Sequence, residues 1–288
     1  MVGSALIEYL SRAGKKVIGT TRRHELVTAT NLYLNLADEV NSFQCPEGLT
    51  IAVMCAGVTK IDQCKMDPIG TTKINVQNTV TIVKKLVENG VFVIYLSTNQ
   101  VFDGSLSYRN ANDPLSPITE YGRQKAEVER KVSMLGNSVA IVRFTKIISP
   151  IVPLFSAWIV ALKNEQPIQP FSNMFISPVP LNFAISSLRL IGDSCLSGIW
   201  QVSGNQDISY VDVARFFART IGKSEDLVQP ILVSQSSFIE SVPSHTTLNI
   251  ERLRDTFGIE PPDVSWTLKK ILLNLEISNT SYNNKGCS

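Results

Sequence analysis

The stretch STNQVFDG, residues 97–104, decides the fold because it closes an apolar run and places polar side chains at its end. The preceding run VFVIYL, residues 91–96, is typical of a strand that is buried on both faces of a parallel sheet. A polar loop follows, and a helical pattern then covers 121–135. Strand, loop and helix in this order predict one unit of an alternating α/β fold.

Tyr121 and Lys125 are four residues apart, which places them one above the other on the same face of a helix. A phenol loses its proton at about pH 10, and an ammonium group close by lowers that pKa. The hydroxyl of Thr98, at the end of the neighbouring strand, could hold a carbonyl against the phenol. Surface helices often show the Tyr-x-x-x-Lys spacing by chance, but the Ser-Thr strand end favours a proton-transfer site for carbonyl or alcohol chemistry.

These segments resemble the extended short-chain dehydrogenase/reductase family and, within it, the dTDP-4-dehydrorhamnose reductase-like branch. LSTNQVFDG at 96–104 is similar to the family pattern S-T-D-x-V-F-x-G, and YGRQK at 121–125 and Ile74-Asn75 match further parts. The resemblance covers most of the chain. It implies an NAD(P)-dependent oxidoreductase that reduces a 4-keto nucleotide sugar, with Thr98, Tyr121 and Lys125 as the catalytic residues.

Two alternatives remain open. The first is a nucleotide-sugar epimerase or dehydratase, which recycles a bound nicotinamide. The second is a non-catalytic regulatory protein that binds a sugar nucleotide or NADP, as a regulatory subunit of methionine adenosyltransferase does in this branch. Asn99 favours the second alternative, because it replaces the branch's usual Asp beside the site.

The predicted fold is α/β, a Rossmann-like doubly wound parallel sheet whose first strand is missing, with a smaller C-terminal substrate-binding part. A helix over 1–10, Gly14 and a strand over 16–21 form the second half of a βαβ nucleotide-binding unit. Gly3 would be the last glycine of its phosphate loop. We expect a chain that begins at an internal Met and binds its cofactor weakly; a genuine start with a shortened sheet is the alternative.

The expected domain limits follow the composition. Residues 1–150 form the NAD(P)-binding domain, and 151–278 form the substrate-binding part. Within the latter, about 178–204 returns to the first domain. Residues 279–288 are a polar tail that we expect to be disordered.

Arg22 and Arg23 follow the second strand at the place where an acidic residue would bind the adenine ribose of NAD. Two guanidinium groups suit a 2′-phosphate instead, so NADP is the predicted cofactor and NAD the alternative. A solvated loop with two charges would also explain the pair. The predicted cofactor contacts are Gly3, Thr21, Arg22, Arg23, Asn35, Leu36, Cys55, Ala56, Gly57, Asn75, Ser97, Tyr121, Lys125 and Thr145.

The predicted substrate contacts are fewer, and the resemblance supplies them. Thr59 and Asp62 lie in a loop that borders the sugar site in this branch, although a role in capping that loop explains them equally well. Lys146 stands where dehydrorhamnose reductases often carry an aromatic residue, so the nucleotide sugar stays open. The substrate set is Thr59, Asp62, Thr98, Asn99 and Lys146.

Other side chains are assigned structural roles. We expect Cys55 to be a small buried residue rather than a nucleophile, and Arg143 to be structural rather than catalytic. Trp158, Trp200 and Trp266 are expected in the core.

Composition excludes several classes of function. A net charge of +2 over 288 residues gives no nucleic-acid or membrane signal. Five cysteines without a C-x-x-C pairing argue for a reducing compartment, which we expect to be the cytoplasm, and against disulfides or zinc. Two histidines are too few for a histidine-based metal site, and no metal is predicted. The expected partner is the nucleotide sugar, and a homodimer is compatible with the sequence.

Overall fold

The computed structural model describes residues 1–149, 152–235 and 242–283, and it divides into two compact units. Unit 1 comprises 1–103, 111–144 and 185–201, and unit 2 comprises the described residues of 104–110, 145–184 and 202–288. The chain thus leaves unit 1 at Phe144 instead of the predicted 150, and it returns for a shorter segment than the predicted 178–204. The earlier limit arises because Thr145 already hydrogen-bonds within unit 2, from its N–H to Val202 O at 3.2 Å.

Unit 1 is an α/β unit built on parallel strands. Its helices are α1 (Val2–Arg12), α2 (Ile61–Met66), α3 (Pro68–Thr72), α4 (Thr79–Glu88), α5 (Glu120–Ser133) and most of α7 (Leu181–Ser194). Its strands are β1 (Gly19–Thr21), β2 (Asn31–Tyr33), β3 (Ile51–Met54), β4 (Phe92–Thr98), β5 (Val139–Phe144) and β9 (Gly198–Val202), whose last residue belongs to unit 2. Short 3-10 turns cover His24–Leu26, Asn99–Val101 and Gly136–Ser138.

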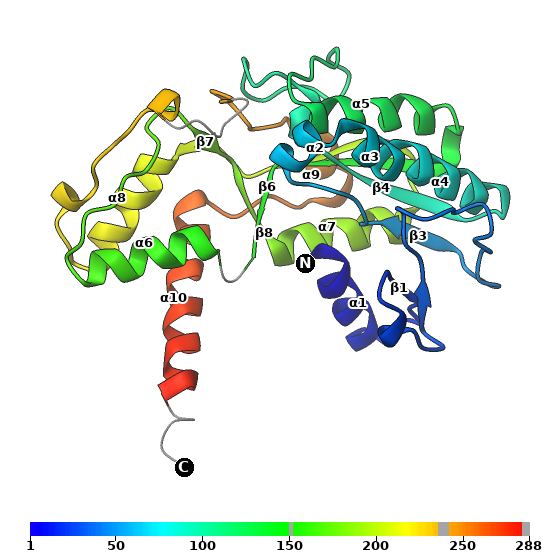
Figure 1. Cartoon of the computed structure of the whole chain (residues 1–288), viewed down its shortest axis with the longest axis horizontal. Helices are drawn as coiled ribbons and strands as arrows, with labels where there is room; N and C mark the ends of the chain where they lie inside the picture. Colours follow the sequence, from blue (N-terminus) through cyan, green and yellow to red (C-terminus); the bar gives the residue numbers. More distant parts are fainter. Residues whose placement is uncertain (150–151, 236–241, 284–288) are drawn as a thin grey trace. The chain divides into compact units, whose positions relative to one another are not determined.

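The strands of unit 1 form two separate sheets. The main sheet has the order β3-β4-β5-β9, with β3 and β5 both parallel to β4, and β1 pairs in parallel with β2. Helices α4 and α5 cover one face of the main sheet and α7 the other (Figure 1). The predicted α/β class with a parallel sheet is therefore confirmed, but among the described residues β1 and β3 are not paired with one another.

The core of unit 1 lies between the main sheet and helices α4 and α5. Alternate residues of β4 face this core, among them Val93 and Tyr95, while Ile94 faces the opposite side near Gly192 of α7. Six of the seven residues of β4 are buried. Burial on both faces explains why this strand has an unbroken apolar sequence.

Helices α3 and α4 are joined by a π-helical segment, η2 (Lys73–Asn78). The wider turn buries two amide side chains, Asn75 and Asn78. Asn78 Nδ2 donates to the carbonyls of Leu36 and Asp38, at 2.8 and 2.9 Å. This segment therefore joins the helix to the loop that follows β2.

Unit 2 combines short strands with helices, and three of these helices contribute side chains to one apolar core. Its elements are β6 (Lys146–Ile148), α6 (Pro153–Lys163), β7 (Phe175–Ile176), β8 (Pro178–Pro180), β10 (Ile208–Ser209), α8 (Tyr210–Thr220), α9 (Glu251–Phe257) and α10 (Val264–Asn283), with 3-10 turns at Glu225–Leu227 and Val233–Gln235. β6 pairs in parallel with β8, and β7 antiparallel with β10.

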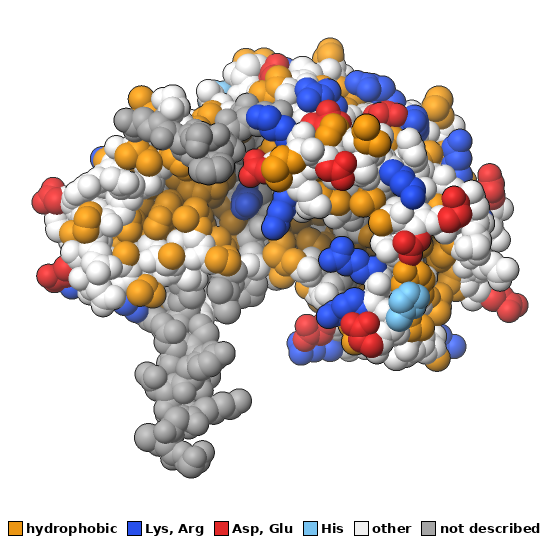
Figure 2. Space-filling model, viewed as in Figure 1, with side chains coloured by type: hydrophobic (Ala, Val, Ile, Leu, Met, Phe, Trp, Pro, Cys, Tyr) orange, Lys and Arg blue, Asp and Glu red, His pale blue; other side chains and the backbone are white. Residues whose placement is uncertain are grey.

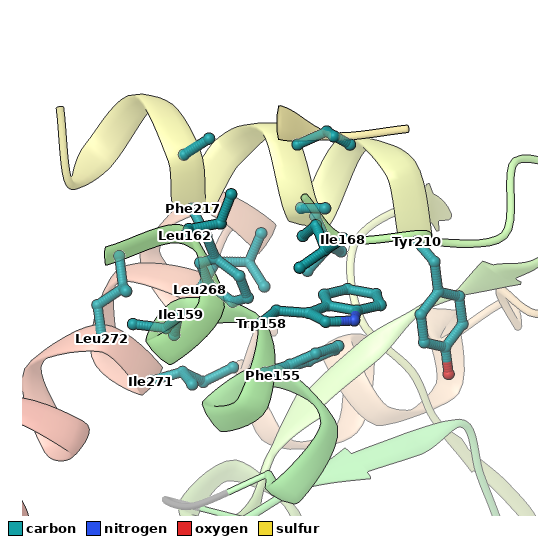
Figure 3. Close-up of a cluster of buried hydrophobic side chains, with 14 of the residues drawn as sticks. Phe155, Trp158, Ile159, Leu162, Ile168, Tyr210, Phe217, Leu268, Ile271 and Leu272 are labelled. Carbon is teal, nitrogen blue, oxygen red and sulfur yellow. The ribbon is translucent and has the colours of Figure 1, made fainter. Parts of the chain in front are cut away.

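Aromatic side chains of α6 and α8 form the centre of that core (Figure 3). The rings of Phe155 and Trp158 lie 5.6 Å apart, and Phe217 meets Phe155 edge-on at 5.5 Å. Trp158 and, in unit 1, Trp200 are buried, as predicted. The prediction for Trp266 is wrong: the residue is 43% exposed, with Lys270 Nζ 5.2 Å from its ring centroid.

The prediction of a disordered tail over 279–288 is wrong for 279–283, because α10 continues to Asn283. Adding a turn to an existing helix costs far less than nucleating one, so α10 extends past its apolar stripe. Residues 284–288 lie outside the described residues. Over the face drawn in Figure 2, acidic and basic side chains are interspersed, in keeping with the net charge of +2. Within the described ranges, no helix combines the length and apolar character that crossing a membrane requires.

Candidate active site

Thr98 and Tyr121 meet where β4 ends and α5 begins. Thr98 is the last residue of β4, and Tyr121 lies in the first turn of α5. The Thr98 side chain acts on the Tyr121 hydroxyl and lowers its pKa, and each residue is only 8% exposed. Thr119 caps the helix by accepting a 3.0 Å hydrogen bond from Gly122 N.

Gly122 allows this close approach. A Cβ at Gly122 would overlap the carbonyl oxygen of Gln100 and would lie 3.1 Å from Thr119 Oγ1. Gln100 belongs to the turn that directly follows Thr98. A side chain at position 122 would therefore push the start of α5, and Tyr121 with it, away from the end of β4.

Lys125 lies one helical turn beyond Tyr121 and is 7% exposed. Its Nζ donates to Leu96 O at 2.7 Å and lies 4.6 Å from the ring centroid of Tyr95 and 5.9 Å from that of Tyr121. Burial lowers the pKa of Lys125 to about 8, although the carboxylate of Glu129 acts in the opposite direction.

Burial raises the pKa of Tyr121 above its ordinary value, and the hydrogen bond from Thr98 offsets this only in part. The sequence predicted the reverse, a phenol whose pKa is lowered by Lys125. The difference arises because the ammonium group of Lys125 is bonded to Leu96 O and lies over the ring of Tyr121. Tyr121 is thus a neutral phenol at neutral pH, the form that can give up a proton.

A buried ion pair lies one turn further along α5. Arg143 Nη2 is 2.7 Å from Glu129 Oε2, and both side chains are at most 3% exposed. The hydroxyl of Ser97 also donates to Glu129, so this predicted cofactor contact directs its side chain towards α5. Sequence reasoning gave Arg143 a structural role but missed Glu129, although the residue continues the four-residue spacing of Tyr121 and Lys125.

Asn75 fixes the loop after β3. Its Oδ1 accepts from Val58 N at 2.7 Å, and its Nδ2 donates to Val58 O at 2.9 Å and to Gln124 Oε1 at 2.8 Å. Gln124 in turn donates to Thr71 Oγ1 at 2.9 Å. Asn75, which the sequence predicted as a cofactor contact, thus holds the backbone of this loop at Val58, and Gln124, which was not predicted, supports it.

The end of β3 is lined by small residues. A Cβ at Gly3 would lie 3.4 Å from Cys55 Cβ, so α1 packs closely on this strand end. Cys55 is half-buried rather than fully buried as predicted, and this burial raises the pKa of its thiol to about 11, which leaves little nucleophilic thiolate at neutral pH. Ala56 and Gly57 follow and are exposed.

The predicted adenine-ribose contacts lie after β1 and β2. Arg22 and Arg23 are exposed, and Arg23 Nε lies 4.0 Å from Glu25 Oε1. The Thr21 hydroxyl accepts from Arg23 N at 3.1 Å. After β2, Asn35 Oδ1 accepts from Ala37 N at 3.1 Å, and Leu36 is buried.

The predicted substrate contacts divide between the units. Thr59 and Asp62 are exposed in unit 1, where Asn99 Oδ1 lies 3.5 Å from Thr98 Oγ1. Lys146 is exposed on β6 of unit 2, and the preceding Thr145, a predicted cofactor contact, is buried and donates to Ser177 O at 2.7 Å. Among the described residues, no three acidic, histidine or cysteine side chains gather as a metal site.

Solved structures share the fold. MoeE5 in complex with UDP-glucose and NAD aligns over 98% of this chain and 96% of its own, with a TM-score of 0.77 and 18% identity. dTDP-4-dehydrorhamnose reductase from Bacillus anthracis in complex with NADP aligns over 77% of this chain and 80% of its own, with a TM-score of 0.70 and 21% identity.

Sequence relatives include both enzymes and regulatory subunits. A dTDP-4-dehydrorhamnose reductase of Aggregatibacter actinomycetemcomitans is 21% identical over 91% of this chain and 94% of its own length. Methionine adenosyltransferase 2 subunit beta of Rattus norvegicus is 23% identical over 73% of this chain and 65% of its own length. The model of the RmlD substrate binding domain matches residues 1–277, and the chain therefore belongs to that family.

Proposed function

We propose that this chain is an NADPH-dependent reductase, with NADH as the alternative cofactor, that reduces the 4-keto group of a nucleotide sugar. The observation that carries the proposal is the burial of Thr98, Tyr121 and Lys125 together, where β4 ends and α5 begins, with Lys125 Nζ bonded to Leu96 O. The family, and the reductase named among the relatives, support this reaction class. The UDP-glucose bound to MoeE5 supports the substrate class, and the NADP and NAD bound to the two similar structures support the cofactor class.

The residues of unit 1 fit a nicotinamide cofactor. Ala56 and Gly57 leave the backbone at the end of β3 uncovered, and Arg22 and Arg23 present exposed guanidinium groups after β1. These groups would hold the ribose 2′-phosphate through paired hydrogen bonds. The cofactor, when bound, supplies a hydride to the carbonyl carbon.

Tyr121 would supply the proton that balances the hydride. Burial keeps the phenol protonated at neutral pH, so it donates to the carbonyl oxygen as negative charge develops there. Thr98 would orient that oxygen against the phenol. The product is an alcohol, and the remaining phenolate is stabilised by the Thr98 hydroxyl and by the ammonium of Lys125 until solvent returns a proton.

A second candidate is a binding protein without turnover. Asn99, half-buried beside Thr98, supports this candidate because it carries no charge where the reductases that the chain resembles usually have Asp. A regulatory subunit among the sequence relatives supports it as well. The intact Tyr121, Lys125 and Thr98 set favours the reductase, because binding alone has no need of a proton donor.

The test follows NADPH oxidation by its absorbance with a panel of 4-keto nucleotide sugars. Tyr121→Phe should reduce turnover by about 10²-fold or more. The exposed Tyr108→Phe is the matched control and should leave turnover unchanged. Equal turnover in Tyr121→Phe and wild type would refute the site, and NADPH binding without consumption would favour the binding protein.

Product analysis in the same assay separates the remaining alternative. An epimerase or dehydratase would convert the sugar without net loss of NADPH, whereas a reductase consumes one cofactor per sugar. We also propose the cytoplasm as the compartment, supported by the free thiols of Cys45, Cys55, Cys64 and Cys195. Sedimentation would test for a homodimer.

A further inference from the structure

Three ionisable side chains are buried in a row on α5. Tyr121, Lys125 and Glu129 follow one another at four-residue intervals and are 8%, 7% and 3% exposed. Side chains at this spacing lie one above the other on one helix face, which here is turned towards β4 and β5. Lysine and glutamate are almost never fully buried unless they are paired. The third member of the row therefore needs an explanation.

The carboxylate of Glu129 is fixed by partners from two strands. Arg143 of β5 donates through Nε to both carboxylate oxygens at 3.1 Å and through Nη2 at 2.7 Å. Ser97, next to Thr98 on β4, donates its hydroxyl to the same carboxylate. Glu129 lies on α5, the helix that carries Tyr121. Its carboxylate therefore bonds this helix to β4, the strand that carries Thr98, and to β5.

Arg143 extends this connection to the loop before Tyr121. Its Nη1 donates to Ala111 O at 2.9 Å, and its guanidinium lies 5.0 Å from the ring centroid of Phe102. Both residues lie in the segment that joins the end of β4 to α5. The guanidinium thereby anchors the carboxylate of Glu129 from the side opposite the helix.

The surroundings of Lys125 otherwise offer little negative charge. Its hydrogen bond goes to the neutral carbonyl of Leu96, and two aromatic rings face it. Glu129 is the carboxylate that acts on its charge, and the cation of Arg143 lies beyond Glu129. The groups facing Lys125 are Tyr121 and Glu129 from α5, Tyr95 from β4, Cys55 after β3 and Cys64 from α2.

We propose that Glu129 is a positioning residue that holds α5 against β4 and β5 and keeps Lys125 charged, with Arg143 as its anchor. The proposal rests on the proposed function, because Lys125 must be cationic to stabilise the phenolate of Tyr121. Glu129 touches neither substrate nor cofactor in this role. It acts through Lys125 and through the register of α5 on β4.

The variant that tests the proposal is Glu129→Gln, which keeps the shape and the hydrogen-bond acceptor but removes the charge. We expect kcat to fall about tenfold with KM unchanged. We also expect the basic limb of the kcat profile to move about one pH unit towards acid, because Lys125 loses its proton more readily without the carboxylate. Glu129→Asp retains the charge and should leave the limb where it is in the wild type.

Glu127→Gln is the matched control. Glu127 lies on the same helix, pairs with Lys131 at 2.7 Å, and both side chains are 43% exposed. The same chemical change there should alter neither kcat nor its pH profile. An equal effect of the two substitutions would overturn the proposal.

A second readout is independent of turnover. The protonation of Lys125 is followed by NMR in protein labelled with ¹³C at the lysine Cε, with the resonance assigned from Lys125→Met. In Glu129→Gln, Lys125 should lose its proton at a lower pH than it does in the wild type. If neither protein turns over but this titration moves, the proposed function fails and the role of Glu129 stands; if turnover persists and neither titration nor pH profile moves, the role of Glu129 fails.

Glu129→Gln leaves Arg143 without its counter-charge and could prevent folding. The double variant Glu129→Gln with Arg143→Met removes both charges, and such replacements of buried pairs are tolerated. The absence of the carboxylate should still move the Lys125 titration towards acid. If Lys125 titrates at the same pH in the folded double variant as in the wild type, the proposal is overturned.

Discussion

Two regions of unit 1 differ in the length of their strand pairing and in how deeply their side chains are buried. β4 and β5 pair over six positions, from Val93 opposite Val139 to Thr98 opposite Phe144, and nearly all of these side chains are buried. β1 and β2 pair over only three positions and are half-exposed. The candidate proton-transfer residues lie in the first region, and the predicted contacts of the adenine ribose lie in the second.

The difference follows from what each task requires of its side chains. A proton donor must be held within about 0.5 Å of its working position, which needs packing and a supporting layer of hydrogen bonds. Two exposed arginines can meet a phosphate from several directions, because a bidentate charge pair supplies its own geometry. Firm packing is thus concentrated around α5 and β4, and regions with fewer buried contacts open more readily.

The largest expected effect comes from breaking the buried ion pair. Arg143→Met leaves Glu129 buried without a counter-charge, and we expect a loss of about 3–5 kcal/mol in the free energy of unfolding. Arg12→Met removes an exposed pair with Glu8 in the N-terminal region, for which less than about 0.5 kcal/mol is expected. Urea denaturation measures both. Similar losses would show that burial of an ion pair does not decide how much it stabilises this chain.

Lys125 should stabilise the chain less than a neutral residue does. Its pKa in the folded chain is about 8, below the ordinary 10.5, so the unfolded chain binds more protons between these values and stability rises with pH there. Lys125→Met removes the cost of burying the cation and should add about 3 kcal/mol at pH 7.

The gain in Lys125→Met should shrink as pH rises above 8 and vanish beyond 10.5, while turnover is lost at every pH. Thermal unfolding at several pH values, beside an exposed Lys131→Met control, measures this. A gain that does not vary with pH would contradict the assignment of the cost to the charge of Lys125.

Gly122→Ala tests the close approach of α5 to the end of β4. The added methyl group meets Gln100 O, a backbone atom that cannot move freely, and should cost about 1–3 kcal/mol. Turnover per folded molecule should also fall, because Tyr121 moves away from Thr98 even where the protein remains folded. Gly14→Ala is the comparison: with φ at +73° and no atom within 4 Å, it should cost about 1 kcal/mol and leave turnover intact.

The sequence could predict the Thr98, Tyr121 and Lys125 group because its signals are local. A run of apolar residues identifies a buried strand, and a spacing of four identifies a helix face. The π-helical segment η2 was not predicted, since one additional residue in a turn barely disturbs an apolar periodicity over 71–89. The predicted strand over 16–21 is shortened to β1 because the neighbouring β2 offers only three residues to pair with.

The role of Glu129 could not be predicted for a different reason. Whether a charged side chain is buried depends on its partner, and Arg143 comes from another element. Trp266 illustrates the converse: a large apolar side chain predicts burial, yet its position on α10 leaves it exposed beside Lys270. Local sequence patterns thus predict where helices and strands form. Which polar side chains become buried depends on contacts between these helices and strands.

The smallest expected effect concerns the weakly held region. Replacing Arg22 and Arg23 together by Ser should lower the preference for NADPH over NADH by about tenfold, which corresponds to one lost phosphate contact of about 1.4 kcal/mol. Cofactor fluorescence measures both dissociation constants, and we expect that for NADPH to lie above the low micromolar range. Replacing Lys15 and Lys16 by Ser is the control for loss of positive charge near β1. An unchanged preference would mean that both arginines belong to a solvated loop, and the difference between the regions would then be one of stability alone.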